Sequence, residues 1–560
     1  MEYRRIIIAI ALSFLVFLAY DLLFGPEKPV QTPQQSEPVT DQTTDKSAEE
    51  TPYIQESAPV GRIPEEAPPE EIPAQKSERQ PARTITVDTP LYTARISEDA
   101  AAFVGLVLKN FRESANGDAA PKELVAENIS DGTVTLTAKN NAIPGLEHAV
   151  FTAQTETDSL QVQSSPSELV FSWQTDRGIV VEKTYRFDPQ SYLIGLRIAL
   201  KNGSTQSITE QLGIVIRNPY EKDRRAIGFH GPSALINNSL EEIDVDDLED
   251  QNRFEGKIQW IGNQTRYFLS GLIPKEIVDT AMQVNMTDET IIENQYLLPE
   301  TVLNPGTQKA FEFNVFQGPK SMRLLSDYNN GLEKAVDFGM FDILAKPCLW
   351  LMNFIYDHLV PNYGIAIIIL TLITKVILWP LGTKSYKSMN EMKKLQPLVQ
   401  KLKEKYKNDR KKLNEETMAL YRTYKINPLG GCLPMVVQIP VFIALYRMLY
   451  EAIELRHAPF LLWINDLSAP DRLLRFGFSI PFMEPPYGIP VLTLVMGASM
   501  FLQQKMSPPM GDTTQAKMML FMPIIFTVIF INFSSGLVLY WLTNNLVSIA
   551  QQFYTQKRLA

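Results

Sequence analysis

The chain has 560 residues, of which 45% are hydrophobic and 21% are charged, and its formal net charge is −10. A negative net charge disfavours a protein dedicated to nucleic-acid binding, so we expect no DNA partner. Two cysteines exclude a disulfide-rich scaffold and a cysteine-rich zinc protein, and the four histidines include no close pair, which disfavours a metal site built from histidine. The first two thirds of the chain is polar or alternates in hydropathy, and the last third contains long apolar runs. This division excludes a wholly soluble and a wholly disordered protein.

The first 24 residues combine positive charge with an apolar run. Arg4 and Arg5 precede the largely apolar stretch Ile6–Tyr20. This pattern is typical of a cleaved signal peptide or of an uncleaved membrane anchor. Bulky residues near the end of the stretch do not form a small-residue cleavage site, which favours an anchor over residues 1–24. The preceding arginines predict that the N-terminus stays in the cytoplasm.

Residues 25–81 have the composition of a linker. They contain 11 prolines, 12 Asp or Glu and a single aromatic residue, Tyr53. Such a segment cannot bury enough apolar surface to offset the entropy of ordering its backbone. We therefore predict a disordered, proline-rich and acidic spacer.

Residues 82–328 show the pattern of a β-rich domain. Short runs rich in β-branched and aromatic residues, such as Thr84–Val87 and Leu193–Leu200, are separated by turn sequences such as Asn116-Gly117. A region of this length predicts one large antiparallel β-sandwich. Because the region follows an anchor that crosses outward, we expect it on the outer side of the membrane.

The chain changes character over residues 329–361. Leu344, Leu351 and Phe354 alternate with polar residues at helical spacing, and Pro347 suits the first turn of a helix. The stretch has too many polar residues to span a bilayer, so we predict an amphipathic helix in the membrane interface. A core helix of the preceding domain is the alternative.

Residues 362–560 contain five apolar stretches near the length that a bilayer requires. They are Tyr363–Leu381, Leu429–Tyr450, Gly488–Lys505, Met518–Phe533 and Ser535–Gln552. With the anchor they predict a polytopic α-helical membrane protein with six spans and with both termini in the cytoplasm. The loops agree with the positive-inside rule. Residues 382–427 carry 13 Lys or Arg against 5 Asp or Glu, whereas residues 451–487 carry 3 against 5.

The basic segment 382–427 has the periodicity of a cytoplasmic helical hairpin. Apolar residues recur every three to four positions on both sides of a turn at Asn408-Asp409, which predicts two facing helices. The outward-facing lysines include Lys393, Lys394, Lys401, Lys405, Lys411 and Lys412. These lysines either dock on ribosomal RNA or anionic lipid headgroups, or only set the membrane topology.

Lys375 lies inside the first apolar stretch, six residues before Leu381, and Thr371 lies one helical turn earlier on the same face. A cation at such a position is costly and usually faces the interior of a helix bundle or a wet cavity. Snorkelling of the ammonium to the membrane surface is the alternative.

Polar side chains also recur at helical spacing in the other apolar stretches. Gln438 adds an amide to the second stretch, and Thr493 and Gln504 belong to a stripe in the third. The stripe in the last stretch consists of Trp541, Asn544, Asn545, Ser548 and Gln552. Polar groups that faced hydrocarbon would each cost several kcal/mol. These stripes therefore face one another in a packed helix interface, or they face water in a hydrated groove.

The spans contain no His–Asp or Cys–His arrangement, no pair of carboxylates and no glycine-rich phosphate loop. Hydrolysis, ATP use and a carboxylate proton relay therefore lack their usual residues. We predict a non-enzymatic protein with no catalytic residues, no metal and no cofactor.

Several blocks of the sequence resemble the YidC-type membrane protein insertases of bacteria. They are Asn427–Pro434, Gln438-Ile439-Pro440, Ala444-Leu445-Tyr446, Pro459-Phe460, Trp463, Asp466-Leu467-Ser468, Phe521-Met522-Pro523 and Ser535–Trp541. The resemblance covers the chain from about Ile343 to its end. The anchor, the acidic linker and the β-rich region have the layout of the Gram-negative form.

The resemblance implies a function in which inner-membrane proteins are inserted and helped to fold, alone or beside the Sec translocon. It implies a hydrated groove open to the cytoplasm, a periplasmic domain similar to a mutarotase-like supersandwich, and several partners. These partners are nascent membrane proteins, the ribosome, components of the signal recognition pathway and anionic lipids. The implied groove residues are Thr371, Lys375, Gln438, Pro440, Tyr540, Trp541 and Asn545. The family usually has arginine at the place of Lys375, so this chain keeps the charge but lacks the planar fork of donors.

Two other functions fit parts of the pattern. A membrane-tethered carbohydrate-binding protein or enzyme would have its activity in the β-rich region and would use the helices as an anchor. An ion-coupled transporter would show internal repeats among its spans, and the five apolar stretches show none.

Overall fold

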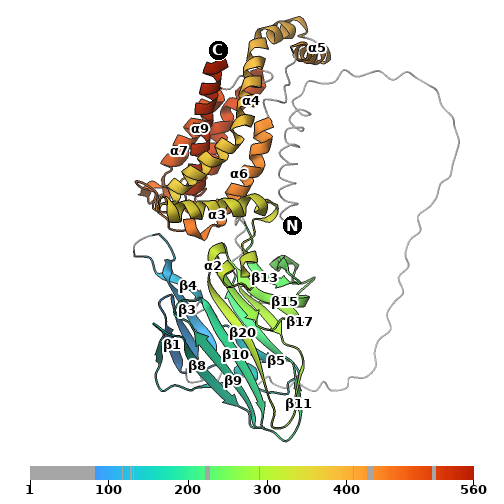
Figure 1. Cartoon of the computed structure of the whole chain (residues 1–560), viewed down its shortest axis with the longest axis vertical. Coiled ribbons are helices and arrows are strands. Elements are labelled where there is room, and N and C mark those ends of the chain that lie inside the picture. Colours follow the sequence, from blue (N-terminus) through green and yellow to red (C-terminus); the bar gives the residue numbers. More distant parts are fainter. Residues whose placement is uncertain are drawn as a thin grey trace, which may run out of the picture. The chain divides into compact units, whose positions relative to one another are not determined.

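The computed structural model describes residues 82–115, 118–125, 129, 131–220, 228–288, 290–407, 409–424, 433–506 and 513–559 (Figure 1). The predicted anchor (1–24) and linker (25–81) lie outside the described residues, as do the turn Asn116-Gly117 and Asn408. The first residues of the predicted span Leu429–Tyr450 also lie outside them.

The described β-rich region contains two main sheets. The smaller sheet has the order β4-β3-β2-β1-β7, and the larger follows the path β5-β12-β18-β17-β15-β16-β20-β10-β9-β8-β6 with β13 and β14 attached. The strands of the smaller sheet are β1 (Thr84–Asp88), β2 (Tyr92–Ser97), β3 (Ala102–Arg112), β4 (Pro121–Val125) and β7 (Ser159–Gln161). Those of the larger sheet are β5 (Thr135–Ala138), β6 (Thr152–Ala153), β8 (Ser167–Gln174), β9 (Ile179–Phe187), β10 (Leu193–Asn202), β12 (Leu212–Pro219), β13 (Gly231–Ile236), β14 (Ser239–Glu242), β15 (Arg253–Gln264), β16 (Phe268–Pro274), β17 (Asp279–Thr287), β18 (Ile291–Leu297) and β20 (Gln308–Pro319).

Antiparallel pairing dominates this region, as the sequence predicts. The long central pair β10–β20 is antiparallel over its whole register, from Leu193 opposite Phe316 to Lys201 opposite Gln308. The pair β1–β7 departs from the prediction because it is parallel. A short antiparallel pair, β11 (Ile208–Glu210) with β19 (Thr301–Leu303), completes the region together with the 3-10 turns Leu146–His148 and Val245–Asp247.

Strand β9 illustrates why these residues form sheet. Every second side chain from Ile179 to Phe187 is buried, which is the period of two that a pleated strand imposes. The buried set includes Val181 and Tyr185, which join a core containing large aromatic side chains such as Trp260. It also includes a charged residue, Lys183, that has no exposed surface.

The ammonium of Lys183 joins three separate segments of backbone. Its Nζ donates hydrogen bonds to the carbonyl oxygens of Ala100, Ala101 and Val134 at 3.0, 2.8 and 2.7 Å. These three residues all have positive φ, at 53°, 46° and 64°, a conformation that is uncommon outside glycine. Burial lowers the pKa of Lys183 to about 7, whereas three carbonyl acceptors favour its charged form. Lys183 therefore holds strained backbone in place.

The segment after the β-rich region is helical. It contains α2 (Met322–Asp327), the 3-10 turns Leu332–Ala335 and Gly339–Phe341, and α3 (Asp342–His358). The expectation that Pro347 lies in the first turn is wrong, because α3 begins five residues earlier and encloses the proline. Figure 1 shows α3 lying crosswise to α4 (Tyr363–Lys405) and α6 (Leu433–Glu451), against which it packs.

Both faces of α3 carry apolar residues. Ala345, Leu349 and Met352 are buried, whereas Ile343 is 83% exposed and Trp350 is 62% exposed. The buried face explains the contact with α4 and α6, and the exposed face suits the predicted interfacial position. That position stays a prediction.

The remaining helices are α5 (Arg410–Thr423), α7 (Val491–Met506), α8 (Thr513–Phe530) and α9 (Ser535–Leu559). They follow the predicted spans and the second arm of the hairpin with shifted ends. The largest difference concerns α4, which continues for 43 residues through Pro380 and Pro397. The predicted boundary between span and hairpin at residue 382 is therefore absent, and one helix serves both.

Among the described residues, α4 is the one helix that meets both the length and the hydropathy expected of a membrane span, with a mean hydropathy of 2.2 over an 18-residue stretch. Met519–Phe530, within α8, is apolar but shorter. Apolar side chains also face outward on other helices, including Leu494 on α7 and Ile524 on α8. Six spans stay a prediction.

Replacement of Lys183 by methionine tests its role in the β-rich region. The Lys183→Met variant removes the lysine donor from three buried carbonyls, of which, among the described residues, only that of Ala101 keeps another donor, the Tyr185 hydroxyl, so we expect the free energy of unfolding to fall by about 3–5 kcal/mol. Hydrogen exchange of the amides in β3, β5 and β9, measured on the purified full chain, reports this loss. The matched variant Lys201→Met, at an exposed position of β10, should change the value by less than about 0.5 kcal/mol. Equal exchange in the two variants would contradict the assigned role.

Candidate functional site

Polar side chains from α4, α6 and α9 meet around Lys375. Its Nζ lies 2.9 Å from Oγ of Ser548 on α9 and 3.5 Å from Oε1 of Gln438 on α6. Lys375 is half-buried and forms no salt bridge with any residue that the structure describes. Its charge thus faces neighbouring helices and has neutral partners.

Further hydrogen bonds extend this arrangement across α6 and α9. Nε2 of Gln438 lies 3.4 Å from the hydroxyl of Tyr540 and 3.4 Å from Oδ1 of Asn544. The Ser548 hydroxyl donates to the Asn544 carbonyl at 2.7 Å, and the Tyr386 hydroxyl donates to the Ser548 carbonyl at 3.4 Å. We call this set the Lys375 cluster: Lys375, Tyr386, Gln438, Tyr540, Asn544 and Ser548.

Helical geometry explains which residues join the cluster. Tyr540, Asn544 and Ser548 are four residues apart and share one face of α9. Asn544 and Ser548 belong to the polar stripe of the sequence but are not among its candidate site residues. Tyr386 was not among the residues predicted from the sequence. It lies on α4, eleven residues or about three turns after Lys375.

Three of the predicted groove residues lie away from the cluster. Thr371 is fully buried, and its hydroxyl donates to the Ile367 carbonyl of its own helix at 2.6 Å. Asn545 is buried, and its Nδ2 donates to Oγ of Ser499 on α7 at 3.1 Å. Pro440 is exposed within α6. The structure therefore brings together Lys375, Gln438 and Tyr540, and it assigns Asn545 to helix packing.

Trp541 belongs to an aromatic cluster beside the Lys375 cluster. The centroid of its ring lies 4.4 Å from that of Phe442 on α6 and 4.9 Å from that of Phe530 on α8, both in edge-to-face geometry. Phe442 also stacks on Tyr540 at 6.3 Å. Aromatic residues thus cover one side of the junction between α6 and α9.

The end of α4 and α5 form the predicted hairpin as far as the described residues go. Leu395 is buried, whereas Tyr424 at the end of the second arm is exposed. The six candidate lysines are exposed. Among them, Lys405 and Lys412 place their Nζ atoms 5.2 and 5.5 Å from the centroid of the Tyr406 ring.

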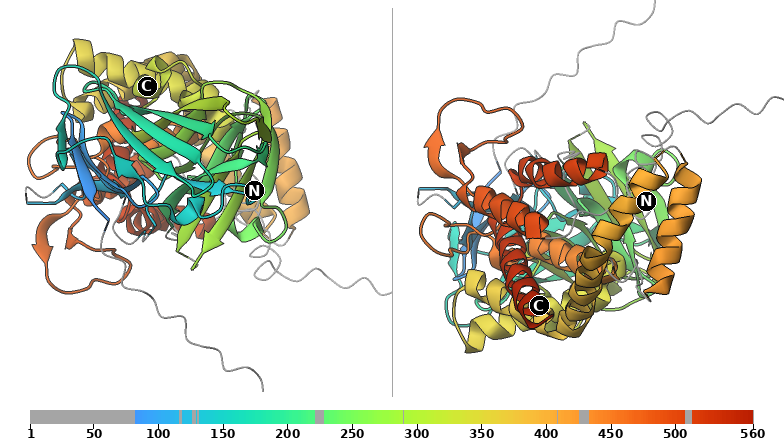
Figure 2. Two further views of the ribbon diagram at one scale, coloured as in Figure 1. Left: turned by 90° about the horizontal axis from the view of Figure 1, so that it is seen from below. Right: turned by 90° about the horizontal axis from the view of Figure 1, so that it is seen from above.

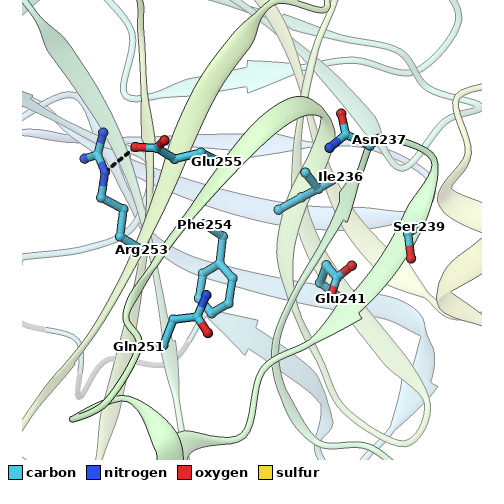
Figure 3. A pocket seen from close by; sticks show the side chains of 8 residues that line it. All are labelled: Ile236, Asn237, Ser239, Glu241, Gln251, Arg253, Phe254 and Glu255. Atoms are coloured by element: carbon cyan, nitrogen blue, oxygen red, sulfur yellow. Dashed lines mark hydrogen bonds and ion pairs between the residues drawn. The ribbon is translucent and has the colours of Figure 1, made fainter.

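An open pocket of about 670 Å³ lies in the β-rich region, between the β13–β14 hairpin and β15. Figure 3 shows its lining residues: Ile236, Asn237, Ser239, Glu241, Gln251, Arg253, Phe254 and Glu255. Arg253 pairs with Glu255 at 2.9 Å, so one of the two carboxylates is already engaged. No group of His, Cys, Asp and Glu that suits a metal ion occurs in the described part of the chain.

Known proteins match the whole length of the chain. Residues 84–351 match the family model described as the YidC periplasmic domain, and residues 354–560 match the one described as 60Kd inner membrane protein. Membrane protein insertase YidC of Syntrophus aciditrophicus is 38% identical over 99% of this chain and 99% of its own. Membrane protein insertase YidC of Geobacter sulfurreducens is 39% identical over 100% of this chain and 99% of its own. A crystal structure of an active YidC insertase covers 85% of this chain and 95% of its own, with 20% identity and a TM-score of 0.37.

These matches define an inner-membrane protein that combines a periplasmic domain rich in antiparallel sheet with a helical region. The chain belongs to the YidC family of membrane protein insertases. Its function is therefore insertion rather than catalysis. The carbohydrate-related alternative rests on the periplasmic domain alone, whereas the relatives match both parts.

The contacts of Asn545 and Gln438 predict different effects of the same truncation. Asn545→Ala removes a buried hydrogen bond between α7 and α9, so we expect a loss of stability of about 1–2 kcal/mol. Gln438→Ala removes only contacts of 3.4–3.5 Å, so its stability should change by less than about 1 kcal/mol. Thermal unfolding of the purified variants in detergent measures both. A larger loss for Gln438→Ala would contradict the assignment.

Proposed function

We propose that this chain inserts inner-membrane proteins, and helps them fold, along a hydrated path that opens to the cytoplasm and passes the Lys375 cluster. The charge of Lys375 carries the proposal. Its ammonium is held by the neutral side chains of Gln438 and Ser548, and no described carboxylate neutralises it. A substrate with an acidic tail can therefore supply the missing partner.

The Lys375 cluster lowers the cost of moving a polar tail through the bilayer. A polar group that enters an apolar medium without a partner costs roughly 2–7 kcal/mol, and an isolated charge costs more. Lys375 offers donors to carboxylates, and Gln438 and Asn544 offer amide donors and acceptors to a passing backbone. These groups replace part of the lost hydration, so the barrier falls without nucleotide or metal.

The junction between α6 and α9 suits the release of an apolar segment into lipid. Its hydrogen bonds, from Gln438 to Tyr540 and Asn544, are 3.4 Å long and therefore weak. The aromatic ring of Trp541 lies beside them. Burial of apolar surface in lipid, at about 0.8 kcal/mol per CH₂ group, drives the release. The membrane potential adds about 2.3 kcal/mol per 100 mV for each negative charge that moves outward.

The proposed membrane arrangement has six spans, with both termini in the cytoplasm and the β domain in the periplasm of a Gram-negative cell. We also propose that the β domain is a supersandwich of the mutarotase-like type. Outward apolar side chains on α7 and α8, such as Leu494 and Ile524, support lipid contact. The basic composition of residues 382–427 supports their cytoplasmic position.

The hairpin formed by α5 and the end of α4 is the proposed docking site for the ribosome, for components of the signal recognition pathway and for anionic lipids. The exposure of its lysines supports this role. The helical region then receives nascent membrane proteins alone or beside the Sec translocon.

Neutralisation of Lys375 tests the proposed path. In protein-free liposomes, Lys375→Gln should lower the insertion of a single-span substrate with an acidic tail by about tenfold, the equivalent of ~1.4 kcal/mol of charge-assisted hydrogen bonding. A substrate with a neutral tail should be affected much less, and Lys375→Arg should restore the acidic substrate. Protease protection of the tail measures insertion.

The control for this experiment is Lys201→Gln, which removes one positive charge from an exposed position of β10. It should insert both substrates as the unaltered chain does. Equal activity of Lys375→Gln on acidic and neutral tails would eliminate the proposed role of the charge.

A second experiment separates docking by the hairpin from topology. Replacement of Lys393, Lys394, Lys401 and Lys411 by glutamine spares the two lysines that contact Tyr406. We expect weaker co-sedimentation with ribosomes and a smaller dependence of binding on salt, because fewer phosphates are contacted. Insertion into protein-free liposomes should be unchanged. Ribosome binding equal to that of the unaltered chain would leave these lysines with a topological role only.

A further inference from the structure

A short β-hairpin lies between α6 and α7, in a part of the chain that none of the family-like sequence blocks covers. β21 (Leu473–Phe476) pairs with β22 (Tyr487–Ile489), and residues 477–486 join them. We call residues 473–489 the outer-loop hairpin. Figure 2 shows it projecting sideways from the helices.

The outer-loop hairpin exposes large apolar side chains. Leu474 is 66% exposed, Phe478 63% and Phe482 81%, and the rings of Phe476 and Phe478 stack with their centroids 5.2 Å apart. A cluster of exposed aromatic and aliphatic residues of this kind marks a surface that contacts a partner or a membrane.

Specific hydrogen bonds hold the hairpin in place. Arg472, which is buried, donates to the carbonyls of Pro486 and Ile531, each at 2.8 Å. Asn532 donates to the Phe482 carbonyl at 2.9 Å and accepts from the Glu484 amide at 2.9 Å. Because Ile531 and Asn532 lie in the connection between α8 and α9, the apolar tip is fixed to the ends of two proposed spans.

The position of the hairpin indicates what covers it. It leads directly into α7 at Val491, and the first turns of α7 expose Leu494 and Val495 to about half. The apolar surface of the hairpin therefore continues into the proposed lipid-facing surface of α7. An apolar element that projects sideways at the ends of spans lies along the membrane surface.

We propose that the outer-loop hairpin is seated in the interface of the outer leaflet, where Leu474, Phe478 and Phe482 contact lipid acyl chains. The hairpin carries one positive and one negative residue, Arg475 and Glu484, so its contact with lipid is apolar and does not require anionic headgroups. Held in this way, the hairpin braces α7 and the α8–α9 connection at the membrane surface. The inference rests on the proposed bilayer position of α7 and α8.

The experiment uses the full chain with Cys348 and Cys432 replaced by serine, and with one new cysteine at Phe478 or Phe482 that carries an environment-sensitive fluorophore. The protein is reconstituted in phosphatidylcholine vesicles that contain lipids spin-labelled near the top of the acyl chain. We expect blue-shifted emission and quenching by the spin-labelled lipid at both positions. Addition of phosphatidylglycerol should leave the quenching unchanged.

Two matched labels make each outcome decisive. Val495→Cys, on the exposed side of α7, should be quenched if α7 lies in the bilayer, and Ser239→Cys, on exposed β14, should not be quenched. Quenching at Phe478 and Phe482 that approaches the Val495 value supports the proposal. Quenching at Val495 without quenching at the hairpin overturns the hairpin proposal alone.

Three other outcomes also overturn it. Absence of quenching at Val495 removes the bilayer position of α7 on which the inference rests. Blue-shifted emission at the hairpin without quenching means that protein, such as a second copy of the chain, covers it. Quenching that appears only with phosphatidylglycerol means that charge, rather than apolar contact, brings the hairpin to the membrane.

Discussion

One positive charge, held inside the helical region by neutral partners, is the constraint on which the arrangement of these helices depends. A cation among apolar helices is costly unless polar groups surround it. α9 supplies the Ser548 hydroxyl and α6 supplies the Gln438 amide, so both helices are drawn to the same height on α4. Because neither partner is charged, the two partners lower the energetic cost of placing the ammonium among apolar helices but do not cancel it. In the proposed function, an acidic substrate finds a site that is partly prepared for it, and such binding energy lowers the barrier to transfer.

The polar residues of α9 divide between two tasks. Asn545 and Gln552 donate to α7, at Ser499 and at the Met506 carbonyl, with distances of 3.1 and 3.0 Å. On the neighbouring face, Tyr540 and Asn544 meet Gln438 at 3.4 Å. Shorter, buried bonds stabilise the packing of α9 on α7, whereas the longer bonds toward α6 leave a junction that separates more readily. α9 can therefore stay packed against α7 while it separates from α6.

Sequence periodicity predicts which face of a helix or strand is buried, and this information was sufficient to predict much of the fold. The antiparallel sheets, the helical stretches and the polar faces that carry Lys375 and Gln438 follow from periods of 2 and 3.6. Tyr540 became a candidate only through the family resemblance. Periodicity does not name partners: Asn544 and Asn545 are adjacent in one stripe, yet they bond to different helices. Nor does it locate helix ends, since prolines that suggest boundaries, such as Pro347 and Pro380, lie within α3 and α4. The parallel pair β1–β7 depends on contacts between distant segments, which local pattern does not contain.

Lys183 and Lys375 differ in how fully their ammonium donors are used, and this difference, more than burial, separates a structural charge from the charge to which we assign the proposed function. Lys183 directs its three donors to three backbone carbonyls and has no exposed surface. An ammonium has only three protons, so Lys183 has no hydrogen-bond donor left for a ligand. Lys375 remains half-buried, and its two partners are side chains that can rotate away. The first lysine therefore fixes backbone, and the second has capacity to exchange its partners for a passing carboxylate.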